Sequence, residues 1–171
     1  MVDFWAQNSR HWFSKNPSFD RRFRERFLGL HQAAARGEFD DWIDDPTGAL
    51  ALMVLLDQFP RNAFRGTARM YATDALALRL ARQALALGHM QRVEAPLRLF
   101  FCLPFAHAES LADQEVSVRL NTLLGPGARA HAERHRDIIR CFGRFPHRNP
   151  LLQRPASDAE RAFLAAGGFA G

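Results

Sequence analysis

The chain has 171 residues, of which 47% are hydrophobic and 24% charged, a composition that fits a globular protein and excludes a disordered or collagen-like chain. No apolar run approaches the roughly 20 residues of a membrane-spanning helix, and the first residues lack the basic and apolar regions of a signal peptide. We therefore expect a single cytoplasmic domain over residues 1–171 that does not enter a membrane. Cys102 and Cys141 lack CxxC spacing and are expected to be free, buried thiols.

The net charge is +5, and Lys15 is the one lysine among the 23 basic residues. The densest basic cluster, residues 21–26, fits the solvated face of a helix whose other face carries Phe19, Phe23 and Phe27. The 18 acidic residues are interspersed among the arginines, so no long basic stripe forms. The charge pattern therefore does not favour a nucleic-acid partner.

Helical spacing of apolar residues recurs along the chain. The first long helix is expected to begin at Asn16 and Pro17 and to end at Gly37, because Pro suits a first turn and Gly a helix end. The next helix has Asp45 as its N-cap and Pro46 as its first residue. Its sequence is apolar on all sides, which predicts a buried central helix.

Later segments show the same periodicity, with Gly88 and Gly143 as helix ends and Pro104 as a break. The serines of two later segments stand three residues before an acidic residue, as in a capping box, in the pairs Ser110 with Asp113 and Ser157 with Glu160. Alternating strand patterns are nearly absent, so we predict an all-α fold of antiparallel helical hairpins. These later helices are expected over residues 73–88, 95–105, 110–125, 128–143 and 157–168.

Two segments, "LLDQFPRNAFRG" and "IIRCFGRFPHRNP", leave an apolar helix through Phe-Pro and continue into Arg and Asn. Pro has no amide hydrogen and pushes the preceding residue out of the helical region. The pairs Phe59-Pro60 and Phe145-Pro146 therefore predict helix stops, with each Phe retained in the core. Because the two segments share this chemistry, we also predict that they lie close together.

The polar residues after each Phe-Pro pair have two interpretations. In the structural one, Arg61 or Arg148 satisfies helix carbonyls, and Asn62 and Asn149 bridge turn amides. In the functional one, the guanidinium groups converge on an anion, since they suit carboxylate or phosphate. The anion site would then contain Arg61, Arg65, Arg144 and Arg148.

The helix expected over residues 128–142 carries His131 and His135 on its apolar face, four residues apart. That spacing could clamp a metal ion, but Glu133 stands one place too late for the zinc-protease pattern. No third ligand is indicated, so no metal site is predicted. Phosphate-loop, dinucleotide and nucleophile motifs are also missing, and no cofactor is predicted.

A histidine on an apolar face is more often a buried structural residue than a ligand. Because a buried imidazole without partners is costly, we expect His135 to meet a polar residue of another helix, with Asp57 and Asp113 as the candidates. Asp137 lies next to Arg136, and a local salt bridge is the expected role for it.

Four segments carry a resemblance to a known family: "FDRRFRERFLGLHQAAARGEFDDW", "LALMVLLDQFPRNAFRGTARMYATDALAL", "LRLFFCLPFAHAESLADQEVSV" and "RHRDIIRCFGRFPHRNPLL". From about Phe4 to Phe169 the chain resembles the mostly bacterial family called domain of unknown function 924. The resemblance implies an all-α fold similar to tetratricopeptide helical hairpins, and it leaves the activity open.

The family pattern also nominates site residues. Two positions depart from it: His131 stands where the family usually has Tyr, and Ala106 replaces the acidic residue before His107. The nominated ligand-binding residues are Asp57, Gln58, Arg61, Asn62, Arg65, His107, Asp113, Gln114, His135, Asp137, Arg144, His147, Arg148 and Asn149.

Three functions are open at this point. The leading hypothesis is a non-catalytic helical binding module that holds a peptide or a small anionic ligand through the Arg, Asn and His residues. The alternative is a small enzyme acting on an anionic metabolite, with His135 or His147 as acid or base and Asp137 or Asp113 orienting it. In the third, the polar residues only clamp helix ends together. The oligomeric state and the pathway are left open.

Overall fold

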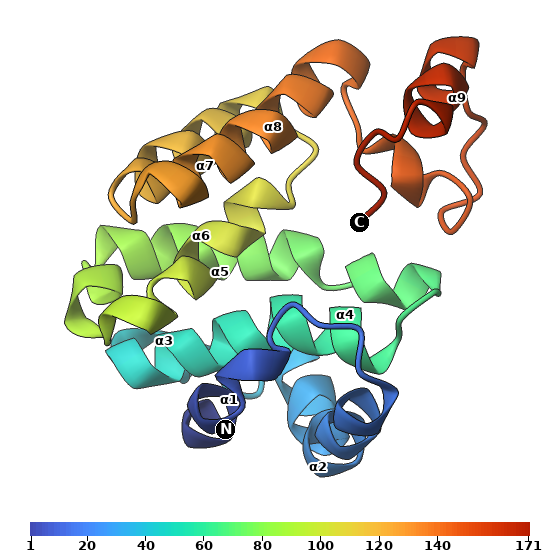
Figure 1. The fold of residues 1–171 in the computed structure, drawn as a ribbon. Helices are drawn as coiled ribbons and strands as arrows, with labels where there is room; N and C mark the ends of the chain where they lie inside the picture. Colours follow the sequence, from blue (N-terminus) through green and yellow to red (C-terminus); the bar gives the residue numbers. More distant parts are fainter. The chain divides into compact units, whose positions relative to one another are not determined.

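The computed structural model describes all 171 residues, and every regular element in it is a helix, as Figure 1 shows. The prediction of an all-α fold is therefore confirmed. Two compact units divide the chain, unit 1 (Met1–Pro104) and unit 2 (Phe105–Gly171). A single domain over residues 1–171 and a tetratricopeptide-like arrangement stay predictions.

The helices lie close to the residue ranges expected from the sequence. None of them is both long enough and apolar enough to cross a bilayer. The α-helices are α1 (Val2–Gln7), α2 (Pro17–Ala35), α3 (Pro46–Met53), α4 (Phe59–Ala63), α5 (Asp74–Ala86), α6 (Leu99–Ala106), α7 (Leu111–Thr122), α8 (Pro126–Phe142) and α9 (Asp158–Ala165). Short 3-10 helices cover Ser9–His11, Asp40–Asp44, Ala68–Tyr71, His89–Arg92, Ala95–Leu97 and Pro146–Arg148.

Side-chain caps fix where several helices begin. Asn16 accepts a hydrogen bond from the amide of Phe19 at 3.0 Å, and the Asp45 carboxylate accepts from the amides of Thr47 and Gly48, both at 2.9 Å. Each cap satisfies an amide that the first turn of a helix leaves without a partner. The predicted starts of α2 and α3 are therefore confirmed.

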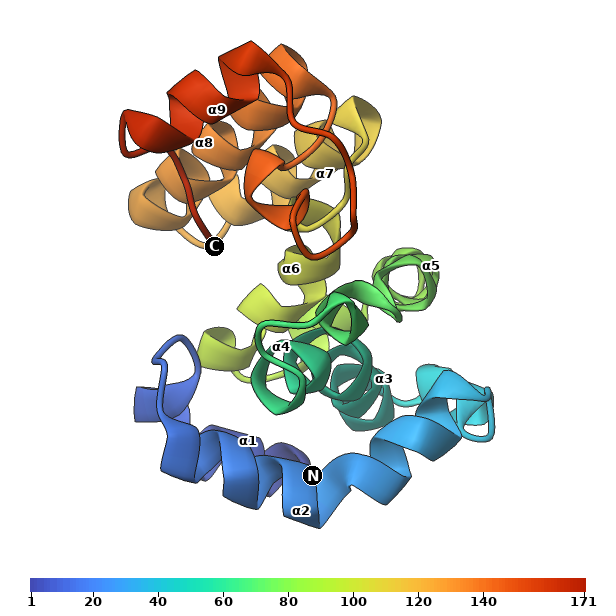
Figure 2. The ribbon, with the colours of Figure 1, turned by 90° about the vertical axis from the view of Figure 1, so that its right-hand side faces the viewer.

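The core of unit 1 is aromatic and aliphatic. Phe19, Phe23 and Phe27 of α2 are buried, as their helical spacing predicts, and the ring of Trp5 lies 5.2 Å from that of Phe23. The segment after Pro46 is buried along nearly its whole length, which confirms the predicted central helix. In unit 2, α7 and α8 lie side by side in both views (Figures 1 and 2), as expected for a helical hairpin.

The prediction that Pro60 stops a helix is wrong. Helix α3 continues through a π-helical segment, η3 (Val54–Gln58), directly into α4, which contains Pro60. In a regular α-helix the proline ring would clash with the carbonyl four residues earlier. The π-helical turn opens the backbone just before the proline, with Phe59 donating to the carbonyl of Val54 five residues back, so the chain absorbs Pro60 without breaking.

The second Phe-Pro pair behaves as predicted. Helix α8 ends at Phe142, and Gly143 adopts a left-handed conformation with φ of 68°. Phe145 is extended and buried, and Pro146 starts a 3-10 helix. Pro104, by contrast, lies inside α6 and does not break it.

Candidate functional site

The nominated site residues belong to two different units, and each set has its own partners. Whether the two sets meet in one site, as predicted from the shared Phe-Pro chemistry, stays a prediction. Unit 1 holds Asp57, Gln58, Arg61, Asn62 and Arg65, and unit 2 holds His107, Asp113, Gln114, His135, Asp137, Arg144, His147, Arg148 and Asn149.

In unit 1 the π-helical segment leaves backbone carbonyls for side chains to satisfy. The carbonyl of Leu56 lies four residues before Pro60, which has no amide to offer it, and it accepts from the Thr73 hydroxyl at 2.6 Å. The carbonyl of Leu55 receives Nδ1 of His31 at 2.9 Å. Because a carbonyl only accepts, this nitrogen carries the proton. Burial lowers the pKa of His31 and so favours the neutral ring.

Arg61 fills the same role one residue later and also binds carboxylates. Its Nη1 donates to the backbone carbonyl of Asp57 at 2.8 Å, and its two terminal nitrogens reach both oxygens of Asp74 at 2.9 and 3.0 Å. The Asp57 carboxylate lies 3.2 Å from the same guanidinium and also accepts from the Gln58 amide at 2.6 Å. Burial alone would lower the pKa of Arg61, but Asp57 and Asp74 raise it above its ordinary value.

Asn62 of α4 and Arg65, which follows the end of this helix, converge on one carboxylate of α2. Asn62 donates to Asp20 at 2.7 Å, and Nε of Arg65 donates to the other oxygen of Asp20 at 3.0 Å. Asn62 therefore binds a side chain of another helix and not the turn amides that the sequence suggested. Both arginines of this set thus have carboxylate partners, which tie α4 to α2 and to α5.

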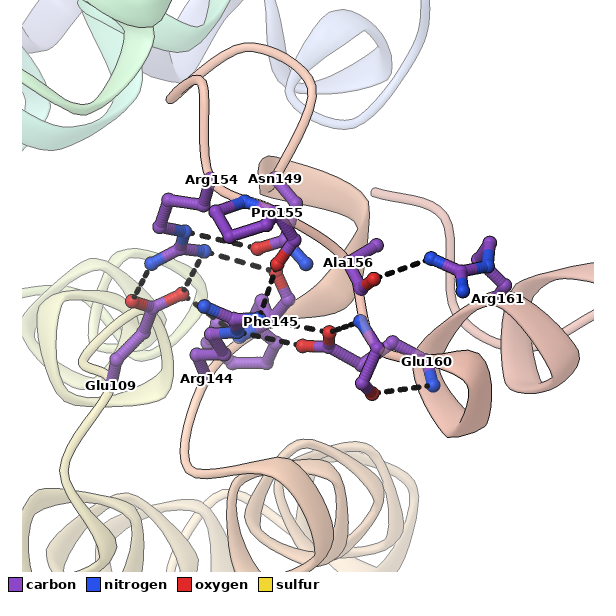
Figure 3. A network of polar contacts seen from close by, with 10 residues as sticks. Glu109, Arg144, Phe145, Asn149, Arg154, Pro155, Ala156, Glu160 and Arg161 are labelled. Carbon is purple, nitrogen blue, oxygen red and sulfur yellow. Dashed lines mark hydrogen bonds and ion pairs between the residues drawn. The ribbon is translucent and has the colours of Figure 1, made fainter.

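Unit 2 contains a second polar network, drawn in Figure 3. Arg154 donates to both oxygens of Glu109 at 2.6 and 3.0 Å, and the amide of Phe145 donates to Glu109 at 2.8 Å. Burial acts to raise the pKa of Glu109, but these hydrogen bonds outweigh it and the pKa lies below its ordinary value. Neither Glu109 nor Arg154 was predicted from the sequence, because nothing in their spacing marks them as a pair.

The adjoining part of the network joins Arg144 to the capping box of α9. Arg144 donates to both oxygens of Glu160 at 2.6 and 2.9 Å, and the amide of Ser157 donates to Glu160 at 2.7 Å. The hydrogen bond from Arg144, followed by that from Ser157, lowers the pKa of Glu160. The predicted capping box is confirmed, and its Glu also binds the arginine that the sequence assigned to an anion site.

The carbonyls at the end of α6 are satisfied by the side chains of Gln114 and Arg148. The Gln114 amide donates to the carbonyls of Phe105, Ala106 and Ala108 at 3.3, 2.9 and 2.8 Å. Nη2 of Arg148 donates to the carbonyl of His107 at 2.9 Å, which is the helix-end role that the structural interpretation gave it.

Other nominated residues have local partners. Asn149 accepts from Nε of Arg154 at 2.9 Å. Asp113 is buried near the start of α7, where its amide donates to Ser110. Asp137 is exposed and pairs with Arg136 at 3.0 Å, as predicted.

His135 is buried, as predicted, with 5% of its surface exposed. Its Nδ1 donates at 3.2 Å to the backbone carbonyl of His131, one turn earlier in α8, and a partner from another helix for the second ring nitrogen stays a prediction. Burial, and then the neighbouring His131 and His107, lower the pKa of His135 to about 3. No group of three or more His, Cys, Asp or Glu side chains is placed to hold a metal ion, but the prediction that no metal binds is not tested by this.

Four rings gather around His135, and we call them the ring cluster: His135, Phe145, His147 and Phe169. The ring centroids of His135 and His147 lie 5.6 and 5.7 Å from that of Phe145. Burial, and then the nearby Arg148, lower the pKa of His147 to about 4. Its Nδ1 is buried and has no hydrogen-bond partner.

The prediction of two free, buried thiols is confirmed for Cys102 and is wrong about the burial of Cys141. Both thiols are free, but only Cys102 is buried, and Cys141 is exposed on α8. Burial raises the pKa of the Cys102 thiol to about 12, so this residue behaves as core material.

Comparison with known proteins agrees with this architecture. The model of a family described as bacterial protein of unknown function (DUF924) matches residues 1–168. The chain belongs to this family. It is also similar to the solved structure of a protein of unknown function from Agrobacterium tumefaciens, with 52% sequence identity, a TM-score of 0.94, and coverage of 97% of this chain and 95% of that one. A search of curated proteins gives no match.

Proposed function

We propose that this protein is a non-catalytic helical binding module that takes a peptide at the ring cluster of unit 2. In this proposal the motif arginines hold the helices together and do not contact the ligand. The proposal keeps the binding function that the sequence favoured and moves it away from the guanidinium groups.

The pairing of the arginines supports a structural role for them. Arg61, Arg65 and Arg144 each bind a carboxylate of the same unit at 3.0 Å or less. An anionic ligand would have to displace a partner that the fold already holds in place, which removes most of the advantage of a guanidinium fork. These contacts favour the helix-clamp hypothesis for the arginines.

The pKa values of the histidines argue against the enzyme alternative. A general acid or base works best when its pKa lies near the operating pH. Burial holds the pKa of His135 at about 3 and that of His147 at about 4. Both rings are therefore neutral and weakly basic at pH 7, and His135 also uses Nδ1 to bind a backbone carbonyl.

The observation that carries the proposal is the unpartnered Nδ1 of His147 beside Phe145. Leaving a buried polar atom without a partner costs about 1–3 kcal/mol, so such an atom in a native fold calls for an explanation. A peptide backbone supplies both an amide donor and a carbonyl acceptor, so it can serve either tautomer of the ring. The neighbouring aromatic rings offer contact surface for an uncharged side chain.

The test is a selection of random heptapeptides displayed on phage against the intact protein and against its Phe169→Ala variant, which lacks one ring of the cluster. We expect enriched peptides whose affinity falls at least about tenfold, equivalent to about 1.4 kcal/mol, in His147→Ala and stays unchanged in Arg65→Ala. Inorganic phosphate should not compete. Failure to enrich any peptide, or peptides that phosphate displaces and that require Arg65, would overturn the proposal.

A further inference from the structure

The ring cluster already holds an aromatic side chain from the chain's own last segment. The ring of Phe169 is nearly perpendicular to both imidazoles, with its centroid 4.6 Å from that of His135 at 80° and 5.1 Å from that of His147 at 83°. It also lies 6.4 Å from Phe145. Edge-to-face contacts at 4.5–7 Å are the favoured geometry of ring pairs, so Phe169 occupies a position that suits an aromatic guest.

Two glycines direct the segment to this position. After α9, Gly167 adopts φ of 81° and donates to the carbonyl of Leu164, and Gly168 donates to the carbonyl of Phe163 at 2.9 Å. A Cβ on Gly168 would lie 2.5 Å from the Phe163 ring. The turn therefore needs glycine at position 167 for its left-handed backbone and at position 168 for the close approach to Phe163.

Within unit 2, the contacts of the segment beyond Gly168 are those of the Phe169 ring. Residues 169–171 form no backbone hydrogen bond within unit 2. Phe169 keeps 37% of its surface exposed although three rings contact it. A segment attached in this way can leave its site without breaking any secondary structure.

The site also restricts the residue that stands two positions after the aromatic guest residue. A Cβ on Gly171 would lie 3.1 Å from Cδ2 and 3.2 Å from Nε2 of His147, and Gly171 has φ of 89°. A side chain at this place would crowd the imidazole and strain the backbone. The position two residues after the aromatic residue is thus best filled by glycine.

We infer that the rings of His135, Phe145 and His147 form a receptor site for a phenylalanine of a partner peptide, with glycine two residues after it, and that Phe169 is the site's internal competitor. This inference rests on the proposed function and names its ligand class. An occupant tethered to the same chain has a high effective concentration. The parent protein therefore binds such a peptide weakly, and loss of Phe169 opens the site.

The probe is the neutral peptide acetyl-Gly-Gly-Phe-Ala-Gly-amide, titrated while the imidazole resonances of His135 and His147 are followed by NMR. We expect Phe169→Ala to bind it at least about tenfold more tightly than the parent, in the millimolar range or below. Replacing the peptide's Phe by Ala should abolish binding, and replacing its last Gly by Ala should weaken it. Leu123→Ala, which removes a leucine that is 71% exposed and lies outside the cluster, should bind like the parent.

Equal affinity in the parent and in Phe169→Ala, or binding that survives loss of the peptide's Phe, would overturn the inference. If Phe169→Ala does not fold, the parent serves instead: excess peptide should drive the ring resonances of Phe169 to their free positions, and unmoved resonances would count against the inference. Peptides that need His147 but contain no aromatic residue would overturn this inference and leave the proposed function standing. Binding of no peptide would remove both.

Discussion

The hydroxyl of Thr73 donates to the backbone carbonyl of Leu56 at 2.6 Å, and this is the carbonyl that an amide at position 60 would bind in a regular helix. Pro60 has no such amide. A residue at the start of α5 therefore completes the hydrogen bonding of the helix that contains the proline. This relationship explains how a Phe-Pro pair can lie inside a continuous helical segment of unit 1.

We expect Thr73→Val to lower the free energy of unfolding by about 1–3 kcal/mol, the cost of a buried carbonyl without a donor. Thr73→Ser keeps the hydroxyl and should lose much less. Urea unfolding of the three proteins measures the difference.

A double-mutant cycle with Pro60→Ala separates this cause from lost packing. Alanine restores an amide that can donate to the Leu56 carbonyl, so Thr73→Val should cost less in the Pro60→Ala background than in the parent. An equal cost in both backgrounds would show that Thr73 stabilises the fold by packing.

Two glycines in helices should respond oppositely to alanine. A Cβ on Gly48 would lie 2.4 Å from the backbone oxygen of Trp42, whereas nothing lies within 4 Å of one on Gly29 in α2. We expect Gly48→Ala to destabilise by about 1–3 kcal/mol through overpacking, and Gly29→Ala to stabilise by about 0.5–1 kcal/mol through helix propensity. Thermal unfolding reports both, and a stable Gly48→Ala variant would contradict the close approach between α3 and Trp42.

Stability should rise with pH between about 5 and 6.5. The pKa of His135 is lowered from 6.5 to about 3 by burial, beside His131, His107 and His147. The unfolded chain therefore binds a proton that the folded chain excludes, and falling pH favours unfolding by up to about 1.4 kcal/mol per pH unit for this group. Lowered carboxyl pKa values, as at Glu109, act at lower pH and in the same direction.

The variant His135→Gln tests both the pH dependence and the structural role of this residue. It should be less stable than the parent at pH 7, because it disturbs a buried site, and its stability should depend less on pH over this window. A variant that melts like the parent at pH 7, with an unchanged pH dependence, would show that His135 is neither structural nor the source of the slope.

Arg61 and Arg65 lie four residues apart and should differ in their tolerance of lysine. The Arg61 side chain is 15% exposed and binds Asp57 and Asp74, whereas that of Arg65 is 35% exposed and binds Asp20 alone. Lysine cannot reproduce the bidentate contact to Asp74. We expect Arg61→Lys to cost about 1–3 kcal/mol and Arg65→Lys less than about 1 kcal/mol in urea unfolding. Equal costs would contradict the buried clamp.

Most helices, several of their caps and the buried central segment of unit 1 could be predicted from the sequence, because these features depend on spacing within a few residues. The Asp45 cap, the Ser157–Glu160 capping box and the left-handed Gly143 are all local features, and each was predicted. The partners of the polar motif residues could not be predicted, because they depend on how distant segments pack together. Pairs such as Arg154 with Glu109 and Thr73 with Leu56 join positions 17 to 45 residues apart, and no periodic pattern selects one carboxylate or carbonyl among many. The helical position of Pro60 could not be predicted for the same reason. Its local preference to end a helix was overcome by a π-helical turn whose carbonyls accept hydrogen bonds from His31 and Thr73, which are distant in sequence.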